Sequence, residues 1–262
     1  MTFTTLHLTV HDGLAEIVLD QPDNGNAFGD TFCAEFGALG TELSARRDVR
    51  AVLLRARGPY FSVGGDLEMF SRDLDAAPRT VLAGTYGLHM GLARLLRMDA
   101  PIVACAHATA MGGALAIVAN CDLVYGARSA SFGAAYGRLG FSCDLGATQG
   151  LASRMGVARA RRLLLLNETL TADEALDAGL VDFVTADDQV EDAARAAAVR
   201  LSHGPTRAYG EVRRLVRRAL AVPFETVLED EAQVLAGLAA TADAREGITA
   251  FTHKRQPHFD GR

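Results

Sequence analysis

The segment PIVACAHATAMGGALAIVANCD, residues 101–122, joins a short apolar run, a turn of small residues and an apolar helix. Pro101 leads into the run at 102–106, which is typical of a buried strand. The helix is expected over 114–120, and Gly112 and Gly113 stand where the turn becomes this helix. A helix start leaves backbone N–H groups unpaired, and glycine lets another molecule approach them closely. The segment therefore predicts either an oxyanion-binding turn or a strand–turn–helix packed tightly by small residues.

A second pair of glycines lies upstream, in RGPYFSVGGDLEMF at residues 57–70. Gly64 and Gly65 follow a short apolar run and precede Asp66 and Leu67, where another helical segment is expected to begin. The chain thus has two places where glycines meet a predicted helix start.

The rest of the chain alternates predicted strands and helices. A hairpin is expected over 3–10 and 14–19, then a helix to about residue 46, a strand over 49–55, a polar loop or lid over 71–79 and a helix over 80–98. Thr171 and Glu174 have the spacing of a capping box, and a short strand follows over 180–184. Helices are expected over 188–203, 205–219, 223–237 and 243–254. This order predicts an α/β fold with crossover connections and a helical C-terminal region.

The composition limits the classes of function. The 262 residues carry 26 basic and 32 acidic side chains, for a net charge of −6, which argues against a nucleic-acid partner. We interpret the arginines of residues 207–218 as a solvated helix face. The four cysteines form no CxxC pair and no histidine cluster has metal-ligand spacing, so no metal is expected. Neither a signal peptide nor an apolar run of about 20 residues is visible, which predicts a cytoplasmic protein with no membrane partner.

Five fragments together resemble the crotonase superfamily, the enoyl-CoA hydratase/isomerase-like proteins. They are PYFSVGGDLEMF (59–70), PIVACAHATAMGGALAIVANCDLV (101–124), ARSASFGAAYGRLGFSCDLGATQGL (127–151), TADEALDAGLVDFV (171–184) and REGITAFTHKRQPHF (245–259). The resemblance implies a crotonase (ClpP/crotonase-like) fold of repeated ββα units in two roughly perpendicular sheets. It also implies a core over 1–200, a helical trimerisation region over 201–262, and a homotrimer or dimer of trimers.

The resemblance also implies a ligand, an acyl-coenzyme A thioester, with no separate cofactor. The backbone N–H groups of Gly65 and Gly113 would hold the thioester oxygen, which agrees with the two glycine turns. Contacts to the substrate and its coenzyme A would come from two loops and, across a subunit interface, from the terminal F-x-x-K-R motif. The residues concerned are Asn26, Ala27, Ser62, Gly64, Asp66, Leu67, Gly112, Phe251, Lys254 and Arg255. Many relatives carry a basic residue in the neighbourhood where this chain has Gly25.

The sequence departs from the family at the positions that carry hydration. Hydratases use one glutamate three residues after the second oxyanion glycine and another in the loop after the SFG segment. The matching residues here are Ala116 and Tyr136. The acidic residue left in that loop is Asp144, at a position where dienoyl-CoA isomerases and the ring-opening isomerase of phenylacetate degradation have an aspartate that moves protons.

Two mechanisms fit Asp144. The local text most resembles the ring-opening enoyl-CoA isomerase of phenylacetate degradation, in which this aspartate moves protons. In the 4-chlorobenzoyl-CoA dehalogenase branch the aspartate is a nucleophile, a histidine twelve positions before the proline of the central strand activates water, and an aromatic residue lies where this chain has Tyr136. The matching histidine is His89, although Gly65 replaces a bulky aromatic residue of that branch.

We favour an isomerase, with the hydrolase or dehalogenase, residual hydratase or lyase chemistry, and a non-catalytic acyl-CoA binder as alternatives. Each side chain also has a structural alternative. Asp144 would then cap the helix that begins near Gly146, Tyr136 would shape the pocket, and His89 would face solvent or pack in the lid.

Overall fold

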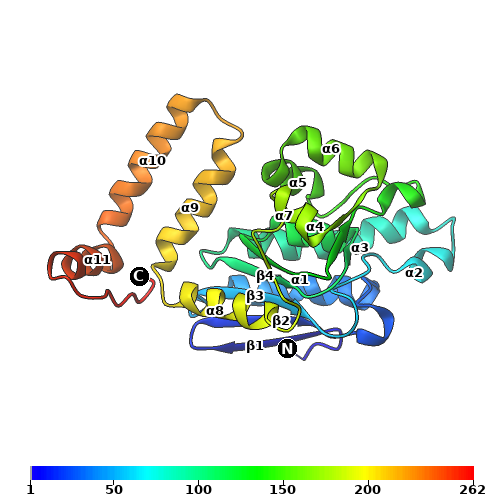
Figure 1. The fold of residues 1–262 in the computed structure, drawn as a ribbon, viewed down its shortest axis with the longest axis horizontal. Helices are drawn as coiled ribbons and strands as arrows, with labels where there is room; N and C mark the ends of the chain where they lie inside the picture. Colours follow the sequence, from blue (N-terminus) through cyan, green and yellow to red (C-terminus); the bar gives the residue numbers. More distant parts are fainter. Residues whose placement is uncertain (1) are drawn as a thin grey trace.

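The computed structural model describes residues 2–262 and contains the strand, turn and helix expected at 101–122. β4 (Ile102–Ala106) is completely buried, β5 (Ala110–Met111) forms in the turn, and α4 (Gly113–Asn120) follows. Every α4 residue from Gly113 to Ala119 is buried, as its apolar composition requires. This segment lies inside the molecule in Figure 1.

The main sheet places β4 at its centre. The strand order is β1-β2-β3-β4-β6-β9, with β1 and β2 antiparallel and the remaining neighbours parallel. Its other strands are β1 (Leu6–His11), β2 (Leu14–Leu19), β3 (Ala51–Ala56), β6 (Leu123–Ala127) and β9 (Phe183–Thr185). The hairpin and the parallel crossovers confirm the sequence prediction, although the last strand begins three residues later than expected.

A second sheet of three strands carries the loops that matter for function. In this sheet β5 pairs with β7 (Ser131–Gly133) in a parallel orientation, and β7 pairs with β8 (Thr169–Thr171) in an antiparallel orientation. Neither β5 nor β8 was predicted, because strands of two or three residues show no alternation of their own. Thr171 ends β8 and caps the next helix, and the predicted capping box with Glu174 is confirmed.

Helices cover both faces of the main sheet. Successive side chains of each strand point to opposite faces, so both faces need a covering layer. Ile17 and Leu54 point to the face that packs against α1 (Asp30–Ser44), α3 (Ala77–Arg97) and α4. Glu16 and Arg55 alternate with them and point to the other face. There Arg195, on α8 (Val190–Ser202), donates to Glu16 at 2.7 Å, and this hydrogen bond is the main cause that lowers the pKa of Glu16 to about 2.

Glycines let α1 and α3 pack backbone against backbone. A methyl group at Gly40 of α1 would come within 2.5 Å of the Gly91 carbonyl oxygen, and one at Gly37 within 3.0 Å of the Gly87 carbonyl oxygen. A methyl group at Gly91 of α3 would overlap the Phe36 carbonyl. This close approach of the α1 and α3 backbones holds α3 against the core.

The predicted loop or lid over 71–79 is wrong in part. Leu67–Ser71 form α2, with the Asp66 side chain as its cap, and α3 begins at Ala77. Pro78 lies in the first turn of α3, where its missing N–H has no helical partner to lose. The remaining helices of the core are α5 (Ala147–Met155), α6 (Val157–Leu166) and α7 (Ala172–Asp177).

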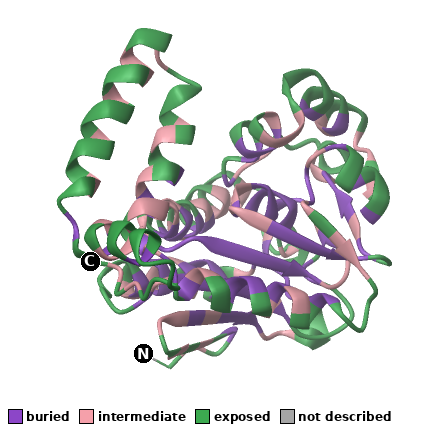
Figure 2. Ribbon diagram, turned by 60° about the vertical axis from the view of Figure 1, so that its left-hand side comes forward, coloured by how far each residue is buried: buried purple, intermediate pink, exposed green. Residues whose placement is uncertain are grey.

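The C-terminal helices form an arm that stands away from the core (Figure 1). It consists of α9 (Thr206–Ala219), α10 (Phe224–Ala239) and α11 (Ala242–Thr252), and α10 contains no buried residue. Figure 2 shows the buried residues gathered in the sheet and its flanking helices, while the α9–α10 hairpin is largely exposed.

The interpretation of residues 207–218 as a solvated face is wrong at one position. Arg213 is only 7% exposed and donates to Asp122 at 2.8 Å and to the Ala100 carbonyl at 2.8 Å. The Arg213 charge is buried together with that of Asp122. This pairing holds α9 beside the start of β4, and therefore beside the segment at residues 101–122. Helical periodicity alone does not tell which arginine of an arginine-rich helix meets an acid elsewhere in the chain.

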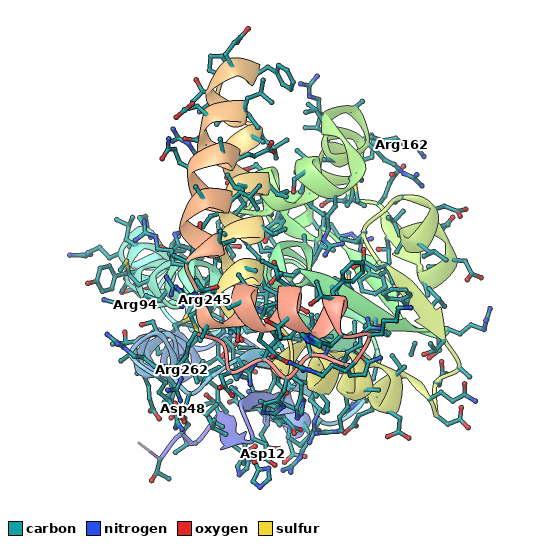
Figure 3. The ribbon with its side chains drawn as sticks, turned by 90° about the vertical axis from the view of Figure 1, so that its left-hand side faces the viewer. Asp12, Asp48, Arg94, Arg162, Arg245 and Arg262 are labelled. Atoms are coloured by element: carbon teal, nitrogen blue, oxygen red, sulfur yellow. The ribbon has the colours of Figure 1, made fainter. Side chains whose placement is uncertain are left out.

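Among the described residues Asp243 is also buried, at 6% exposure, whereas many other charged side chains are exposed. Asp48 and Arg162 are 61% and 68% exposed and lie at the periphery in Figure 3. Across residues 2–262, no helix is long and apolar enough to cross a membrane.

The α1–α3 contact yields a stability prediction. Gly91→Ala places a methyl group against the Phe36 carbonyl, so we expect a loss of about 1–3 kcal/mol from overpacking. Gly237→Ala is the matched control, because nothing lies within 4 Å of a methyl group there and alanine favours a helix by up to about 1 kcal/mol. Urea unfolding at one protein concentration measures both, and equal effects of the two variants would contradict the contact.

Candidate active site

The two glycine turns lie against each other. Gly64 has a φ of 88°, and a methyl group on it would come within 2.7 Å of the Met111 carbonyl oxygen and 3.4 Å of the Gly113 nitrogen. The Met111 amide donates to the Ser62 carbonyl at 3.0 Å, which pairs the two segments as neighbouring strands. The structure therefore brings together two stretches that lie far apart in the sequence, as the prediction requires.

The four glycine amides of these turns have two different states. The Gly64 N–H donates to the Ser62 hydroxyl at 3.0 Å, and the Gly112 N–H donates to the Gly133 carbonyl at 2.9 Å. Within residues 2–262, the N–H groups of Gly65 and Gly113 have no acceptor. A buried amide without a partner is uncommon, and Gly113 is buried at the start of α4, where the helix dipole favours negative charge. These two amides can donate to an oxyanion, whereas Gly64 and Gly112 shape the turns.

Tyr136 and Asp144 form a hydrogen-bonded pair beside these turns. The phenol of Tyr136 donates to Oδ1 of Asp144 at 2.8 Å. Burial, together with the negative charge of Asp144, raises the pKa of Tyr136, so the phenol stays protonated and remains a donor. Ala135, just before the tyrosine, has a φ of 59°, a conformation that costs a non-glycine residue about 1–2 kcal/mol. The loop thus holds the side chains of residues 136 and 144 in contact.

Asp144 does not cap a helix with its side chain. The N-terminal cap of α5 is Gly146, and no side-chain cap hydrogen bond is formed there. The Asp144 backbone carbonyl accepts from the Ala147 amide instead, at 2.9 Å. The structural alternative for this aspartate is therefore wrong, and its carboxylate has the Tyr136 phenol as partner.

Leu145 links the Asp144 loop to the oxyanion turn. Its side chain is 1% exposed, and a methyl group at Gly113 would come within 3.2 Å of it. Its carbonyl accepts from the Asn120 side chain at 3.1 Å, and its amide donates to Nε2 of His89 at 3.1 Å. His89 therefore comes from α3 to the same loop, as expected of a site residue, but its Nε2 is already used as an acceptor.

Ala116 is the residue at which the sequence predicts that a hydratase glutamate is missing. It is completely buried one helical turn after Gly113 in α4. Tyr136 occupies the other matching position and contacts Asp144. Of the residues at these matching positions, Asp144 alone is a carboxylate.

Two aromatic residues that the sequence did not single out lie next to the donors. Phe70 on α2 and Phe141 in the Asp144 loop meet edge to face, with ring centroids 5.8 Å apart. A methyl group at Gly65 would lie 3.6 Å from the Phe70 ring. Only the glycine motif before Phe70 and the loop around Phe141 could have suggested them, because their contact depends on the tertiary fold.

The predicted coenzyme A residues divide into two groups. Asn26 and Ser62 are 1% and 0% exposed, and their polar atoms bind the protein itself. The Asn26 amide donates to the carbonyls of Arg57, Tyr60 and Phe61, and the Ser62 hydroxyl donates to the Asn26 carbonyl at 2.8 Å. These two side chains hold the loops in shape.

The other predicted binding residues are more accessible or lie elsewhere. Ala27 is 8% exposed, Leu67 is 50% exposed, and Asp66 caps α2 through the Glu68 amide. Phe251 is 85% exposed on α11, and Lys254 follows that helix. Figure 1 places α11 at the opposite end of the molecule from α2, so the chain does not bring these two residues to its own glycine turns.

An open groove of about 750 Å³ lies between α1 and α3 and does not include the two free amides. Cys33 lines it, and burial, followed by the charges of Asp30 and Asp144, raises the pKa of its thiol to about 12. In residues 2–262 no three His, Cys, Asp or Glu side chains are grouped so as to hold a metal ion.

Comparisons with known proteins assign the fold and the family. A model described as enoyl-CoA hydratase/isomerase matches residues 9–262. The chain belongs to the enoyl-CoA hydratase/isomerase family. Its fold is accordingly the crotonase fold that the sequence predicted, and it superposes with a TM-score of 0.88 on the enoyl-CoA hydratase of Mycobacterium smegmatis, at 27% identity over 98% of this chain and 99% of that one.

Some relatives within the family are named as hydratases and others as isomerases. The chain is 33% identical to a protein named "Probable enoyl-CoA hydratase" from Rhodobacter capsulatus, and 31% identical to the 1,2-epoxyphenylacetyl-CoA isomerase of Escherichia coli. Both matches cover 100% of this chain and 100% of the relative. Membership of the family is consistent with an acyl-CoA thioester substrate and does not distinguish hydration from isomerisation.

Alanine substitution should lower activity strongly at Gly64 and only slightly at the adjacent Gly65. Gly64→Ala forces a methyl group against the Met111 carbonyl and a side chain into a φ of 88°, so the second turn must move away. We expect kcat to fall about 10²–10³-fold, the usual effect of losing one oxyanion donor. Gly65→Ala places its methyl group at an ordinary 3.6 Å from Phe70 and should retain activity within about 3-fold. Steady-state kinetics on an acyl-CoA substrate measure both, and similar losses in the two variants would contradict the assignment.

Proposed function

We propose that this enzyme is an enoyl-CoA isomerase that moves a proton with Asp144 while Gly65 and Gly113 hold the thioester oxygen. The observation that carries the proposal is the Asp144 carboxylate, which is held by Tyr136 at 2.8 Å and tied through Leu145 to Gly113. The substrate is an unsaturated or cyclic acyl-CoA, and the product has its double bond shifted or its ring rearranged.

The oxyanion pair supplies the stabilisation that proton removal needs. When a proton leaves the carbon α or γ to a thioester, negative charge collects on the carbonyl oxygen. Two preorganised N–H groups aimed at that oxygen stabilise the enolate more than the uncharged thioester. The unpaired amides of Gly65 and Gly113 support this role.

Asp144 is the group that fits the role of acid and base. Oδ1 accepts from the Tyr136 phenol, so Oδ2 remains to take the proton and to return it at another carbon. The hydratase route uses two carboxylates, and Ala116 and Tyr136 occupy both of those positions. Transfer of one proton by one carboxylate therefore agrees better with the site than addition of water.

The nucleophilic alternative requires a base that activates water, in addition to Asp144 as the nucleophile. His89 is the candidate, and it reaches the loop, but its Nε2 accepts from the Leu145 amide at 3.1 Å. This nitrogen would have to give up that hydrogen bond to take a proton from water. The geometry therefore favours the isomerase over the hydrolase or dehalogenase.

Asp144→Asn is the direct test, with Asp173→Asn, a 69% exposed aspartate on α7, as control. Removal of the general base should lower kcat about 10²–10⁴-fold on 3-enoyl-CoA substrates, with the control unchanged. Full activity of Asp144→Asn would exclude Asp144 as the base. A covalent acyl adduct on Asp144 during turnover, seen by mass spectrometry, would instead support the nucleophile. Coenzyme A binding in a thermal-shift assay without turnover of any acyl-CoA would support the non-catalytic binder.

We also propose that the arm assembles the enzyme into a homotrimer or a dimer of trimers in the cytoplasm. Large apolar side chains on the arm are exposed, among them Val216 at 62%, Leu235 at 71% and Phe251 at 85%. Apolar surface of this kind marks an interface. In such an assembly Phe251 and Lys254 would reach the coenzyme A of a neighbouring subunit.

Light scattering after size-exclusion chromatography measures this assembly. We expect a mass of three or six chains of 27.8 kDa each. Leu235→Glu, which puts a charge on the exposed face of α10, should shift the mass toward the single chain. A monomeric wild-type protein at micromolar concentration would contradict the proposal.

A further inference from the structure

His89 contacts the catalytic loop through a backbone amide, and this contact gives it a role different from that of a base. We propose that His89 is a positioning residue, whose Nε2 accepts from the Leu145 amide and so holds Asp144 next to the oxyanion donors. This inference rests on the proposed function of Asp144 as acid and base.

Leu145 has a conformation that requires external support. Its φ is 48°, in the left-handed region, which costs a side chain other than glycine about 1–2 kcal/mol. Such a residue keeps its conformation only where its surroundings determine it. The peptide that joins Asp144 to Leu145 carries the amide in question, so the direction of this amide also sets the direction of the Asp144 backbone.

Three contacts determine Leu145, two of them from α4 and one from α3. Asn120 of α4 donates to the Leu145 carbonyl at 3.1 Å, and the Leu145 side chain packs at the Gly113 turn. His89 of α3 accepts from its amide at 3.1 Å. The first two contacts tie the residue to the helix that provides an oxyanion donor, and the third ties it to a separate helix.

Helix α3 is a firm support for this contact. Gly87 and Gly91 flank His89, and both pack against the backbone of α1 so closely that a methyl group on either would overlap a carbonyl. The His89 backbone therefore has little freedom to move relative to the core. A fixed acceptor can hold the loop, whereas an acceptor on a mobile segment could not.

The chemistry of the hydrogen bond defines the state of the ring. A backbone N–H can only donate, so Nε2 must offer a lone pair, and a neutral ring then carries its proton on Nδ1. In this state Nε2 cannot serve as the base toward water. His89 thus acts on the reaction through the geometry of Asp144, whose Oδ1 is held at the same time by Tyr136.

The test compares His89→Ala with His89→Gln in the full-length protein. Glutamine can offer its side-chain oxygen where the histidine offers Nε2, whereas alanine offers no acceptor. We expect His89→Ala to lower kcat about 10- to 100-fold with KM nearly unchanged, because a displacement of about 1 Å at the reacting group costs that much. His89→Gln should recover most of the loss. His11→Ala, an exposed histidine in the β1–β2 hairpin, should match the wild type.

Hydrogen exchange gives a readout that does not need a substrate. The Leu145 amide should exchange faster in His89→Ala than in the wild type, and His89→Gln should keep it protected. Unchanged protection in His89→Ala would overturn the inference, even if no acyl-CoA substrate is turned over.

The kinetic outcomes separate this inference from the proposed function. If Asp144→Asn is inactive and His89→Ala is as active as the wild type, the inference fails and the isomerase stands. If both His89 variants fall to the level of Asp144→Asn, His89 takes part in the chemistry itself and the positioning role is wrong. If Asp144→Asn keeps full activity, the proposed function fails, and hydrogen exchange alone decides whether His89 holds the loop.

Discussion

The active site depends on one backbone contact, between Gly64 and the Met111 carbonyl. A φ of 88° and the absence of a side chain let Gly64 lie where a methyl group would be 2.7 Å from that oxygen. This contact places the next residue, Gly65, beside the start of α4. The amides of Gly65 and Gly113 come from segments almost fifty residues apart, and the contact between the two turns brings these segments together. Both sheets and the packing of α4 serve to hold this contact.

Asp144, the proposed acid and base, is linked to the same contact through Leu145. In the hydratase pattern a glutamate on α4 would take part directly, but Ala116 occupies that place. The carboxylate comes instead from a loop in which Ala135 and Leu145 both have positive φ. Strain of this kind persists when the surroundings determine the conformation, and here Tyr136, His89 and Asn120 provide the hydrogen bonds. The proposed oxyanion donor and the proposed acid and base thus come from different segments that meet at Gly113.

Local pattern predicted most of the longer elements, and the resemblance predicted the family. The apolar run at 102–106, the glycines at the helix start and the capping box at Thr171 each determine nearby backbone, and each was confirmed. What could not be predicted depends on contacts between distant segments. The glycines of α3 resemble helix-weakening residues in the sequence, and only the packed structure shows that they admit α1. The burial of Arg213 depends on Asp122, ninety-one residues away. Asn26 and Ser62 match binding motifs, yet their side chains are buried in the loops that carry them.

The central claim is that the thioester oxygen binds both amides while Asp144 faces the carbon that loses its proton. A crystal structure of Asp144→Asn with a 3-enoyl-CoA bound measures this most directly. The account predicts that the thioester oxygen lies within hydrogen-bonding distance, about 3 Å, of both the Gly65 and the Gly113 nitrogen atoms. It also predicts that residue 144 lies beside the α or γ carbon. A thioester oxygen bound away from either amide, or an acyl chain directed away from residue 144, would contradict it.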